Sequence, residues 1–441
     1  METTLLNDDF SLENMLDNWQ SLTHSQREQV FAILGRIDQE ELFINLSADY
    51  QAELFDLVPH AERRSWIRLL PPDDIADLIQ NLDSEAHAEA LRSLDYATLV
   101  EVKALMAYAE DEAGGLMNSR FARLRPEMTV EEAIRYLRAQ SKSHIETIYY
   151  AYVLDRTQKL LGVISLRELF LAKEQSTVEE NMNTDLVTVL QDEDQESISK
   201  TFSNHNFLAL PVVDDQNFMK GIITVDDVVE VIVEEATEDI HKIGGMEALG
   251  EPYLDISLPS MIKKRAGWLM ALFIGEMFTA TAMSHYEHDI AKAVVLALFI
   301  PLVISSGGNS GSQATTLIIR AMALGEVRLK DWFRVFTREL VSGLSLGLIL
   351  GLIGLMRILL WPGKETLYGD HYILVAITVA CSLVGIVLWG TLAGSMLPFL
   401  LRRLGLDPAT SSAPFVATLV DVTGLIIYFT VASIFLKGIL L

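Results

Sequence analysis

Two carboxylates stand inside long apolar stretches of this sequence, and they are its strongest candidates for chemistry. Asp421 is the only charged residue in PFVATLVDVTGLIIYFTVASIF, and Glu276 is the only one in AGWLMALFIGEMFTATAMS. A carboxylate at membrane depth is costly, so it normally faces a cavity, a partner or an ion. We predict a cation site at Asp421. Glu276 is an open case, because the hydroxyls of Thr279 and Thr281 are close enough in sequence to satisfy it locally.

A second polar signal is the segment PLVISSGGNSGSQATT, which begins with Pro301 and carries Gly307, Gly308 and Asn309. Its glycines and hydroxyls predict an apolar span that is broken, with carbonyl groups exposed to a water-filled path. Oxygen ligands and one or two carboxylates suit Mg²⁺, which keeps much of its water. The segment has no cluster of Cys, Met or His, which argues against soft metals.

Composition divides the chain of 441 residues and formal charge −26 into two unlike halves. Residues 258–441 carry 14 basic and 10 acidic residues, whereas residues 1–257 carry 20 basic and 50 acidic ones. Nucleic acid is therefore excluded as a partner, because phosphate binding needs a basic surface. The single cysteine excludes disulfides within the chain and fits a reducing cytoplasm for the acidic half. The N-terminus has no signal-peptide pattern.

The second half reads as a membrane domain, because a helical span needs about 20 apolar residues. We predict five spans, at about 266–284, 291–322 (broken), 339–360, 372–400 and 412–436. Basic residues before span one, between spans two and three and between spans four and five outnumber those on the other side. This distribution predicts a cytoplasmic N-terminus and an external C-terminus. Two glycine series are expected to pack helices closely: Gly343, Gly347 and Gly351, and Gly390 with Gly394.

The first half reads as two modules. Residues 1–118 show short helices opened by Pro59, Pro71, Asp83 and Asp95, a pattern typical of a superhelical array. Residues 119–236 then alternate strand and helix. GVISLRELF and GIITVDDVV place two copies of this unit 59 residues apart, which indicates an internal repeat.

The repeat resembles a tandem pair of CBS domains through PVVDDQNFMKGIITVDDV. With AGGLMN, EEATEDIHKIGG and the membrane segments SSGGNSGSQATTLIIRAMALGEV and DPATSSAPFVATLVDVTG, the whole chain resembles the MgtE family of magnesium channels. The implied fold is a multidomain α and α/β membrane protein. It has a helical N domain (1–118), CBS domain 1 (119–176), CBS domain 2 (177–236), a connecting helix (237–262) and a transmembrane domain (263–441).

The resemblance also implies a mechanism: a homodimeric Mg²⁺-selective channel for uptake, in the cell or inner membrane, held shut by cytosolic Mg²⁺. Its implied pore residues are Asp421, Asn309, Gly307, Gly308 and Ala417, with Glu276 as a further membrane-embedded acid. The candidate regulatory metal ligands are Asp214, Asp215, Asp226, Asp227, Glu247, Glu251 and Asp95. Compact packing of the acidic half is repulsive unless cations bridge it.

A nucleotide is the remaining candidate ligand. CBS domain 2 keeps Thr224 and Asp227, the pair that contacts ribose in nucleotide-binding CBS domains, so ATP is a candidate there. CBS domain 1 has Arg167 in place of an acid, in SLRE (165–168), and we expect no nucleotide on it. Asp227 is also one of the candidate regulatory metal ligands, so a nucleotide and a metal ion would compete for it.

Three rival functions stay open. One is an ion-coupled transporter of another divalent cation such as Co²⁺, with Glu276 as the coupling site. Another is an intramembrane hydrolase, for which only Asp421 and Glu276 are available and no HExxH or GxxxxGK[ST] motif is present. A membrane-anchored sensor without a pore is the third, and the polar second span argues against it. We therefore do not expect an enzyme.

Overall fold

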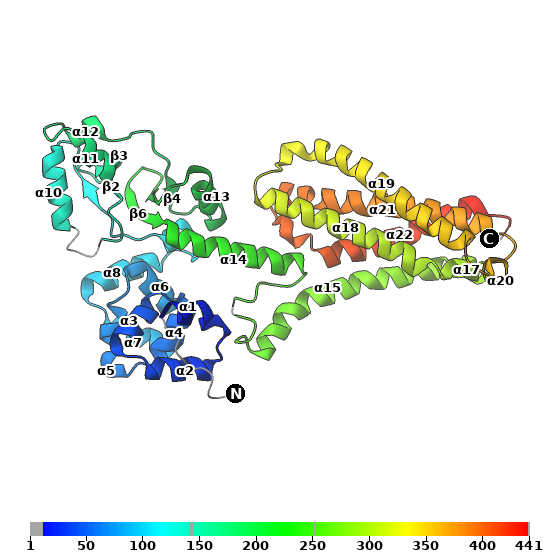
Figure 1. Cartoon of the computed structure of the whole chain (residues 1–441), viewed down its shortest axis with the longest axis horizontal. Coiled ribbons are helices and arrows are strands. Elements are labelled where there is room, and N and C mark those ends of the chain that lie inside the picture. Colours follow the sequence, from blue (N-terminus) through cyan, green and yellow to red (C-terminus); the bar gives the residue numbers. More distant parts are fainter. Residues whose placement is uncertain (1–11, 141–144, 251, 440–441) are drawn as a thin grey trace. The chain divides into compact units, whose positions relative to one another are not determined.

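The computed structural model describes residues 12–140, 145–250 and 252–439, and the chain forms two compact units, Met1–Glu235 and Ala236–Leu441. Glu251 therefore lies outside the described residues. The first unit holds a helical N domain and a CBS pair, and the second holds the long apolar helices (Figure 1).

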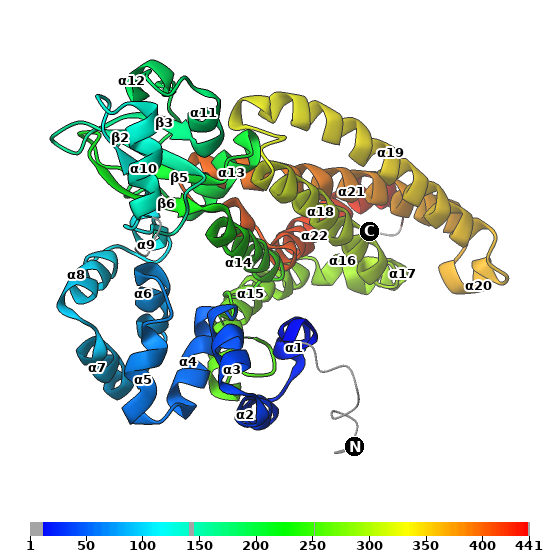
Figure 2. The ribbon, with the colours of Figure 1, turned by 60° about the vertical axis from the view of Figure 1, so that its left-hand side comes forward.

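The helical N domain is a run of short helices stacked in an arc (Figure 2). As the sequence predicted, Pro59, Pro71, Asp83 and Asp95 stand at helix N-caps. The Asp83 carboxylate accepts hydrogen bonds from the backbone N–H groups of Glu85 and Ala86, which stabilises the first turn. The elements are α1 (Leu12–Asn18), η1 (Trp19–Ser21), α2 (His24–Ile33), α3 (Arg36–Ile44), α4 (Ala48–Leu57), α5 (His60–Ile67), α6 (Pro72–Gln80), α7 (Ser84–Ser93), α8 (Tyr96–Leu105) and α9 (Ala113–Leu116).

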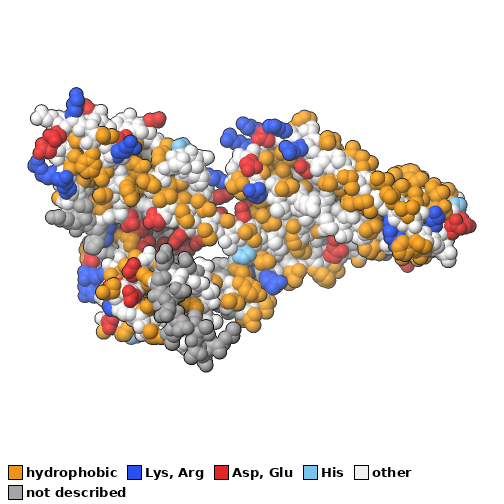
Figure 3. Space-filling model, viewed as in Figure 1, with side chains coloured by type: hydrophobic (Ala, Val, Ile, Leu, Met, Phe, Trp, Pro, Cys, Tyr) orange, Lys and Arg blue, Asp and Glu red, His pale blue; other side chains and the backbone are white. Residues whose placement is uncertain are grey.

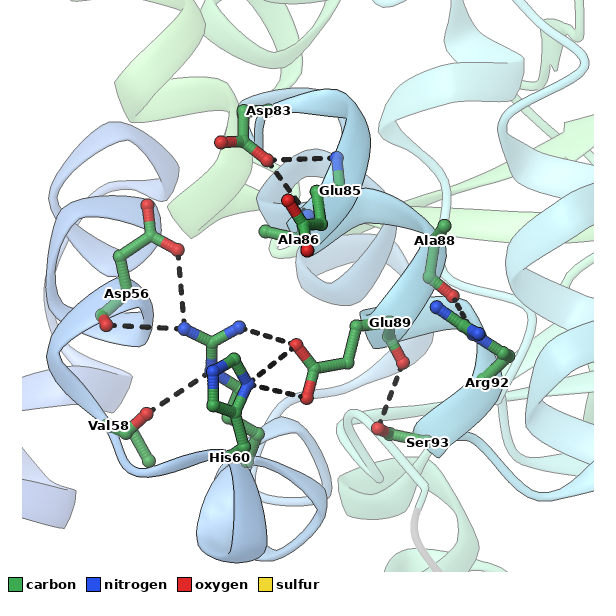
Figure 4. Close-up of polar contacts among 11 residues, drawn as sticks. Asp56, Val58, His60, Asp83, Glu85, Ala86, Ala88, Glu89, Arg92 and Ser93 are labelled. Carbon is green, nitrogen blue, oxygen red and sulfur yellow. Dashed lines mark hydrogen bonds and ion pairs between the residues drawn. The ribbon is translucent and has the colours of Figure 1, made fainter.

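A buried ion pair repeats within this array. Arg63 donates to Glu89 at 2.7 Å, and His60 Nδ1 lies 2.9 Å from the same carboxylate (Figure 4). Thirty-six residues earlier, Arg27 donates to Glu53 at 2.9 Å and His24 Nδ1 lies 2.9 Å from it. Both arginines are buried, so the ion pairs satisfy charges that water does not reach. The array therefore contains a structural repeat of 36 residues.

The CBS pair consists of two similar three-stranded sheets. In each, a short first strand pairs parallel with the second, which pairs antiparallel with the third. Register shifts fall at Val153/Leu154 and at Val212/Val213, 59 residues apart, so the repeat predicted from the sequence extends to the strand pairing. The elements are β1 (Arg123–Leu124), α10 (Val130–Gln140), β2 (Tyr150–Leu154), β3 (Leu160–Ser165), α11 (Leu166–Leu171), α12 (Val178–Asn181), β4 (Val189–Leu190), α13 (Gln195–His205), β5 (Ala209–Val213) and β6 (Met219–Thr224).

The connecting segment differs from the helix predicted at 237–262. Helix α14 (Val225–Ile243) begins directly after β6 and ends before a glycine pair, and the next helix begins only at Leu258. Gly245 has a φ of +73°, a left-handed conformation that favours glycine and ends the helix. A Cβ there would lie 2.7 Å from Trp268 and 3.2 Å from Pro414, so the close approach also requires glycine.

The second unit has five helices that are long and apolar enough to cross a membrane among the described residues. Apolar side chains cover much of its visible face, and basic side chains gather where α19 begins (Figure 3). The elements are α15 (Leu258–His285), α16 (Glu287–Lys292), α17 (Val294–Ala297), α18 (Ile300–Ala323), η2 (Leu329–Asp331), α19 (Trp332–Leu359), α20 (Lys364–Tyr368), α21 (Tyr372–Arg403), η3 (Pro408–Thr410) and α22 (Ala413–Leu436).

The predicted break of span two at its glycines is wrong. Helix α18 runs unbroken through Gly307, Gly308 and Asn309, and the interruption lies earlier, between α17 and α18. The glycines serve packing instead. A Cβ on Gly390 would lie 2.3 Å from the Gly307 carbonyl oxygen, and one on Gly394 would lie 2.2 Å from that of Gly311. Helices α18 and α21 therefore cross backbone to backbone, and the carbonyl groups of α18 stay within its helix.

The other glycine series packs as predicted. A Cβ on Gly347 would lie 2.9 Å from Val384 and one on Gly351 would lie 2.9 Å from the Ala380 carbonyl oxygen. These contacts bring α19 close to α21, and the core of the unit forms between α17, α18, α21 and α22.

Candidate functional sites

The membrane unit has a hollow of about 340 Å³ where α15, α18 and α22 meet. Asp421 from α22, Asn309 from α18 and Glu276 from α15 all border it. The residues that line it are Glu276, Thr279, Pro301, Ile304, Ser305, Gly308, Asn309, Ala417 and Asp421. Three helices thus bring two carboxylates, an amide and hydroxyl groups to one place, and these are oxygen ligands suited to a hard cation.

Small residues keep the space in front of Asp421 open. A Cβ on Gly308 would lie 3.5 Å from the Ala417 Cβ and 4.0 Å from Asp421 Oδ1. Any side chain longer than alanine at Gly308 would therefore fill the hollow. Gly307 faces the other way, toward Ile386 of α21, so it packs the helix and does not line the hollow.

A second hollow, of about 300 Å³, lies in the first unit and is lined by carboxylates. Helix α6 contributes Asp73, Asp74 and Asp77, and α14 contributes Asp227, Glu230 and Glu234. Asp49, Glu110 and Asp111 lie at its edge. Within the described residues, no three His, Cys, Asp or Glu side chains are already arranged to hold a metal ion.

The charges of this hollow repel one another. Burial, together with the nearby charges of Asp227 and Glu146, raises the pKa of Asp74 to about 7. Burial likewise raises the pKa of Asp77 to about 8, with Asp74 as the next cause. Such carboxylates are stabilised in the ionised form by a bound cation. The donor set therefore fits a hydrated divalent ion.

Asp73 lies on the α6 wall of the acidic hollow, and Asp227 lies on the α14 wall. Asn118 is fully buried, and its Nδ2 donates to Asp73 Oδ1 at 3.0 Å and to Glu146 Oε2 at 2.8 Å. Burial raises the pKa of Asp73 well above its usual range, and Asp74 and Asp227 add to this effect. Burial also raises the pKa of Asp227 to about 6, although a hydrogen bond from Thr224 opposes it.

Of the predicted regulatory residues, the acidic hollow contains Asp227 alone. Asp226 is exposed beside it. Asp214 accepts backbone hydrogen bonds in the β5–β6 turn and pairs with Lys220 at 3.0 Å, and Asp215 is exposed in that turn. Asp95 caps α8, where hydrogen bonds from Thr98 lower its pKa.

Glu247 lies in the second unit, exposed in the segment between α14 and α15. Its backbone N–H donates to the Lys264 carbonyl oxygen at 3.2 Å. The structure therefore places it within the connecting segment, close to the start of the first membrane span.

Sequence reasoning missed the acids of α6 and the later acids of α14. The signal was helical spacing: in PPDDIADLIQ, Asp77 follows Asp74 by three residues and Asp73 by four, so it neighbours both on the helix surface. Asp227, Glu230 and Glu234 likewise recur at intervals of three and four residues. Pairing these two acidic faces requires the tertiary fold.

The CBS pair holds a third hollow, of about 710 Å³, beside the first repeat. Its wall contains Tyr149, Tyr150 and Tyr152, the turn Ser165–Glu168 with Arg167, and the segment 207–211. Ser165 Oγ donates to Glu168 Oε2 at 2.7 Å, and Thr224 Oγ1 donates to Asp227 Oδ2 at 2.6 Å at the matching turn of the second repeat. Unlike Ser165, Thr224 does not border this hollow, and Asp227 faces the acidic one.

Known proteins resemble the chain along its full length. The MgtE intracellular N domain matches residues 12–111, the CBS domain matches 113–174 and 177–234, and the MgtE divalent cation transporter domain matches 300–431. The magnesium transporter MgtE of Thermus thermophilus is 41% identical over 430 residues, which make up 97% of this chain and 93% of that protein. The chain belongs to the MgtE family.

A further relative and a solved structure are also similar to the chain. The magnesium transporter MgtE of Enterococcus faecalis is 33% identical over 337 residues, 76% of this chain and 72% of that protein. A crystal structure of the cytosolic domain of the Mg²⁺ channel MgtE in complex with ATP is 38% identical, with a TM-score of 0.47, and covers 51% of this chain and 91% of that one. MgtE proteins are magnesium transporters and not enzymes, and the five apolar helices make this chain a multi-pass membrane protein.

Proposed function

We propose that the protein is a homodimeric Mg²⁺ channel that is closed by Mg²⁺ bound to its acidic cytoplasmic part. The hollow that Asp421 shares with Asn309 carries this proposal, because it places oxygen donors on helices that cross the membrane. Mg²⁺ gives up its water reluctantly, so a hollow bordered by two carboxylates and an amide suits a hydrated ion. Gly308 and Ala417 leave room for that hydration shell.

The acidic hollow supports the proposal that cytoplasmic Mg²⁺ closes the channel. A cation bound among the carboxylates of α6 and α14 relieves their repulsion, so it favours the compact arrangement by mass action. Helix α14 is the element through which this signal travels. After its acidic turns it reaches Lys242, which pairs with Asp407 at 2.7 Å just before the pore helix α22.

The proposed orientation has the N-terminus in the cytoplasm and the C-terminus outside, because five spans put the two ends on opposite sides. Basic residues gather at the ends of spans that would face the cytoplasm, as the positive-inside rule requires. They are Lys263, Lys264, Arg265, Arg328, Lys330, Arg334, Arg402 and Arg403. A second copy is proposed on the resemblance to the MgtE family; the apolar face of α15, with Phe273 68% exposed, is one that lipid or protein can cover.

Asp421→Asn tests the conduction site. In proteoliposomes that hold the full chain, the wild type should pass Mg²⁺ and Asp421→Asn should lose flux by at least about tenfold, since an ionic ligand is replaced by a neutral one. Glu339→Gln is the matched control, because Glu339 lies in membrane helix α19 and does not border the hollow. Equal flux in Asp421→Asn and wild type would refute the site. A Co²⁺ flux that exceeds Mg²⁺ flux, or one that needs a proton or sodium gradient, would favour the coupled-transporter alternative.

Nucleotide binding is a second candidate function, and the 710 Å³ hollow favours it. Tyr150 and its neighbours offer aromatic faces for a base, and Arg167 offers a guanidinium for phosphate. The site we propose is therefore at the first repeat rather than at Thr224 and Asp227, where the surrounding carboxylates would repel phosphates.

ATP titration of the full chain separates the two placements. We expect Arg167→Ala to weaken ATP binding by about tenfold through loss of a charge-assisted contact, and Asp227→Asn to leave it unchanged. The opposite pattern would return the nucleotide to the second repeat.

A further inference from the structure

We propose that Glu276 supplies a second carboxylate to the ion site of Asp421, so that each subunit offers the permeating ion a charge of −2. This inference rests on the proposed conduction site. Glu276 and Asp421 line the same hollow from different helices, α15 and α22.

The approach of α15 to α22 is built into the sequence next to Glu276. A Cβ on Gly275 would lie 2.9 Å from Thr418 Cγ2, closer than real Cβ contacts normally are. Glycine at this position lets the two helices meet, and the following residue then points its carboxylate toward the hollow. One turn after Thr418, α22 presents Asp421. The local packing thus brings both acids to the same hollow.

Thr279 provides an independent sign of a ligand. Its hydroxyl oxygen is shielded from solvent and has no hydrogen-bond partner, although Thr279 lines the hollow. Other threonines of these helices bond back to their own helix: Thr281 donates to the Met277 carbonyl oxygen and Thr418 to that of Pro414. Thr279 is different, and a water molecule of a hydrated cation in the hollow would satisfy it.

The chemistry of the group favours a divalent cation. Two carboxylates that border one hollow repel one another unless a positive charge lies between them, and a divalent ion compensates both. Asn309, Ser305 and Thr279 then contact the hydration shell. Hard oxygen donors on all sides match Mg²⁺ rather than a soft metal. Glu276 therefore sets the affinity and the charge preference of the site that Asp421 defines.

The test compares Glu276→Gln, Glu276→Asp, Asp421→Asn and the control Glu339→Gln in the full-length protein. Mg²⁺ flux into proteoliposomes is measured against Mg²⁺ concentration, with and without competing Na⁺. We expect Glu276→Gln to raise the half-saturating Mg²⁺ concentration by about tenfold and to increase block by Na⁺. Glu276→Asp should restore much of the affinity, and Glu339→Gln should match the wild type.

The outcomes separate this inference from the proposed function. If Glu276→Gln keeps the wild-type concentration dependence while Asp421→Asn loses flux, Glu276 is not a ligand and the conduction site stands. If Asp421→Asn also conducts normally, the conduction site itself is wrong. Glu276→Asp is the second readout, because it keeps the carboxylate. A folded Glu276→Asp variant with the same half-saturating Mg²⁺ concentration as Glu276→Gln would likewise overturn the proposal.

Discussion

The carboxylates of this chain differ in whether neighbouring groups compensate their charge. Asp95 and Asp214 are satisfied by hydrogen bonds at a helix cap and a turn, which lower their pKa values. Asp74 and Asp77 face other acids, and their pKa values are raised. We therefore expect cations to bind at the acids that lack hydrogen-bond partners or basic neighbours. Sequence position alone does not separate these acids from the ones that caps and turns satisfy.

Asp77→Asn should stabilise the Mg²⁺-free protein. Because the folded pKa of Asp77 is raised to about 8, the folded state binds more protons than the unfolded state between about pH 4 and pH 8. Stability of the acidic hollow should thus fall as pH rises through this window, and Asp77→Asn should remove part of the fall. Hydrogen exchange of the α6 and α14 amides in the full chain, measured against pH, reports this change in stability.

The control for this prediction is Asp95→Asn, which keeps a capping side chain. It should alter neither the pH dependence nor the protection that Mg²⁺ gives to α6 and α14. Faster exchange in Mg²⁺-free Asp77→Asn than in the wild type would contradict our interpretation of the hollow.

Helix α18 illustrates how an element takes its shape from its neighbours. Its glycines and hydroxyls predicted exposed backbone, yet the helix is continuous because Gly307 and Gly311 receive the backbone of α21. Some polar side chains of α18 form hydrogen bonds to α21. The Ser310 and Thr391 hydroxyls lie 2.6 Å apart, and Thr315 donates to the Gly394 carbonyl oxygen. A membrane helix with many small residues is thus a packing surface as well as a polar one.

Substitutions within α21 test this packing. Gly390→Ala places a methyl group against the Gly307 carbonyl group and should destabilise the membrane unit by about 1–3 kcal/mol, since backbone cannot move aside easily. Gly385→Ala is the matched control, because its Cβ would meet Ile427 at an ordinary 3.4 Å. Thermal unfolding of the purified variants gives the comparison, and equal stability of the two would contradict the close crossing.

Much of the fold follows from patterns that are local in sequence. The five spans, the CBS repeat and the helix caps of the N domain were predictable because each depends on apolar runs, a fixed period or a capping residue. The glycines and proline of GGMEALGEP indicate a helix end there, but the contacts of Gly245 with Trp268 and Pro414 were not predictable, because those residues are distant in sequence. That Asp421 faces a hollow was predictable from its apolar setting, whereas the acidic hollow needed two helix faces brought together.

At the scale of the whole molecule, charge is segregated: the acidic residues lie mostly before residue 258 and the apolar spans after it. Helix α14 spans the boundary in sequence between the two compact units, which falls after Glu235. It carries Asp227, Glu230 and Glu234 near its start and Lys242 near its end, where Glu238 and Asp407 pair with that lysine. A cation-dependent change at the acidic turns therefore has a continuous helix along which to act on the start of α22.

Mg²⁺ flux controlled from one side of the membrane tests the central claim most directly. Oriented proteoliposomes with the cytoplasmic part accessible should conduct Mg²⁺ when that side holds micromolar Mg²⁺ and should close when it holds millimolar Mg²⁺. A variant with Asp74, Asp77 and Glu230 neutralised should lose this Mg²⁺ dependence and conduct little at either concentration, because the repulsion that opposes the compact, closed arrangement without Mg²⁺ is gone. Flux that is independent of Mg²⁺ on the cytoplasmic side in the wild type would contradict the account.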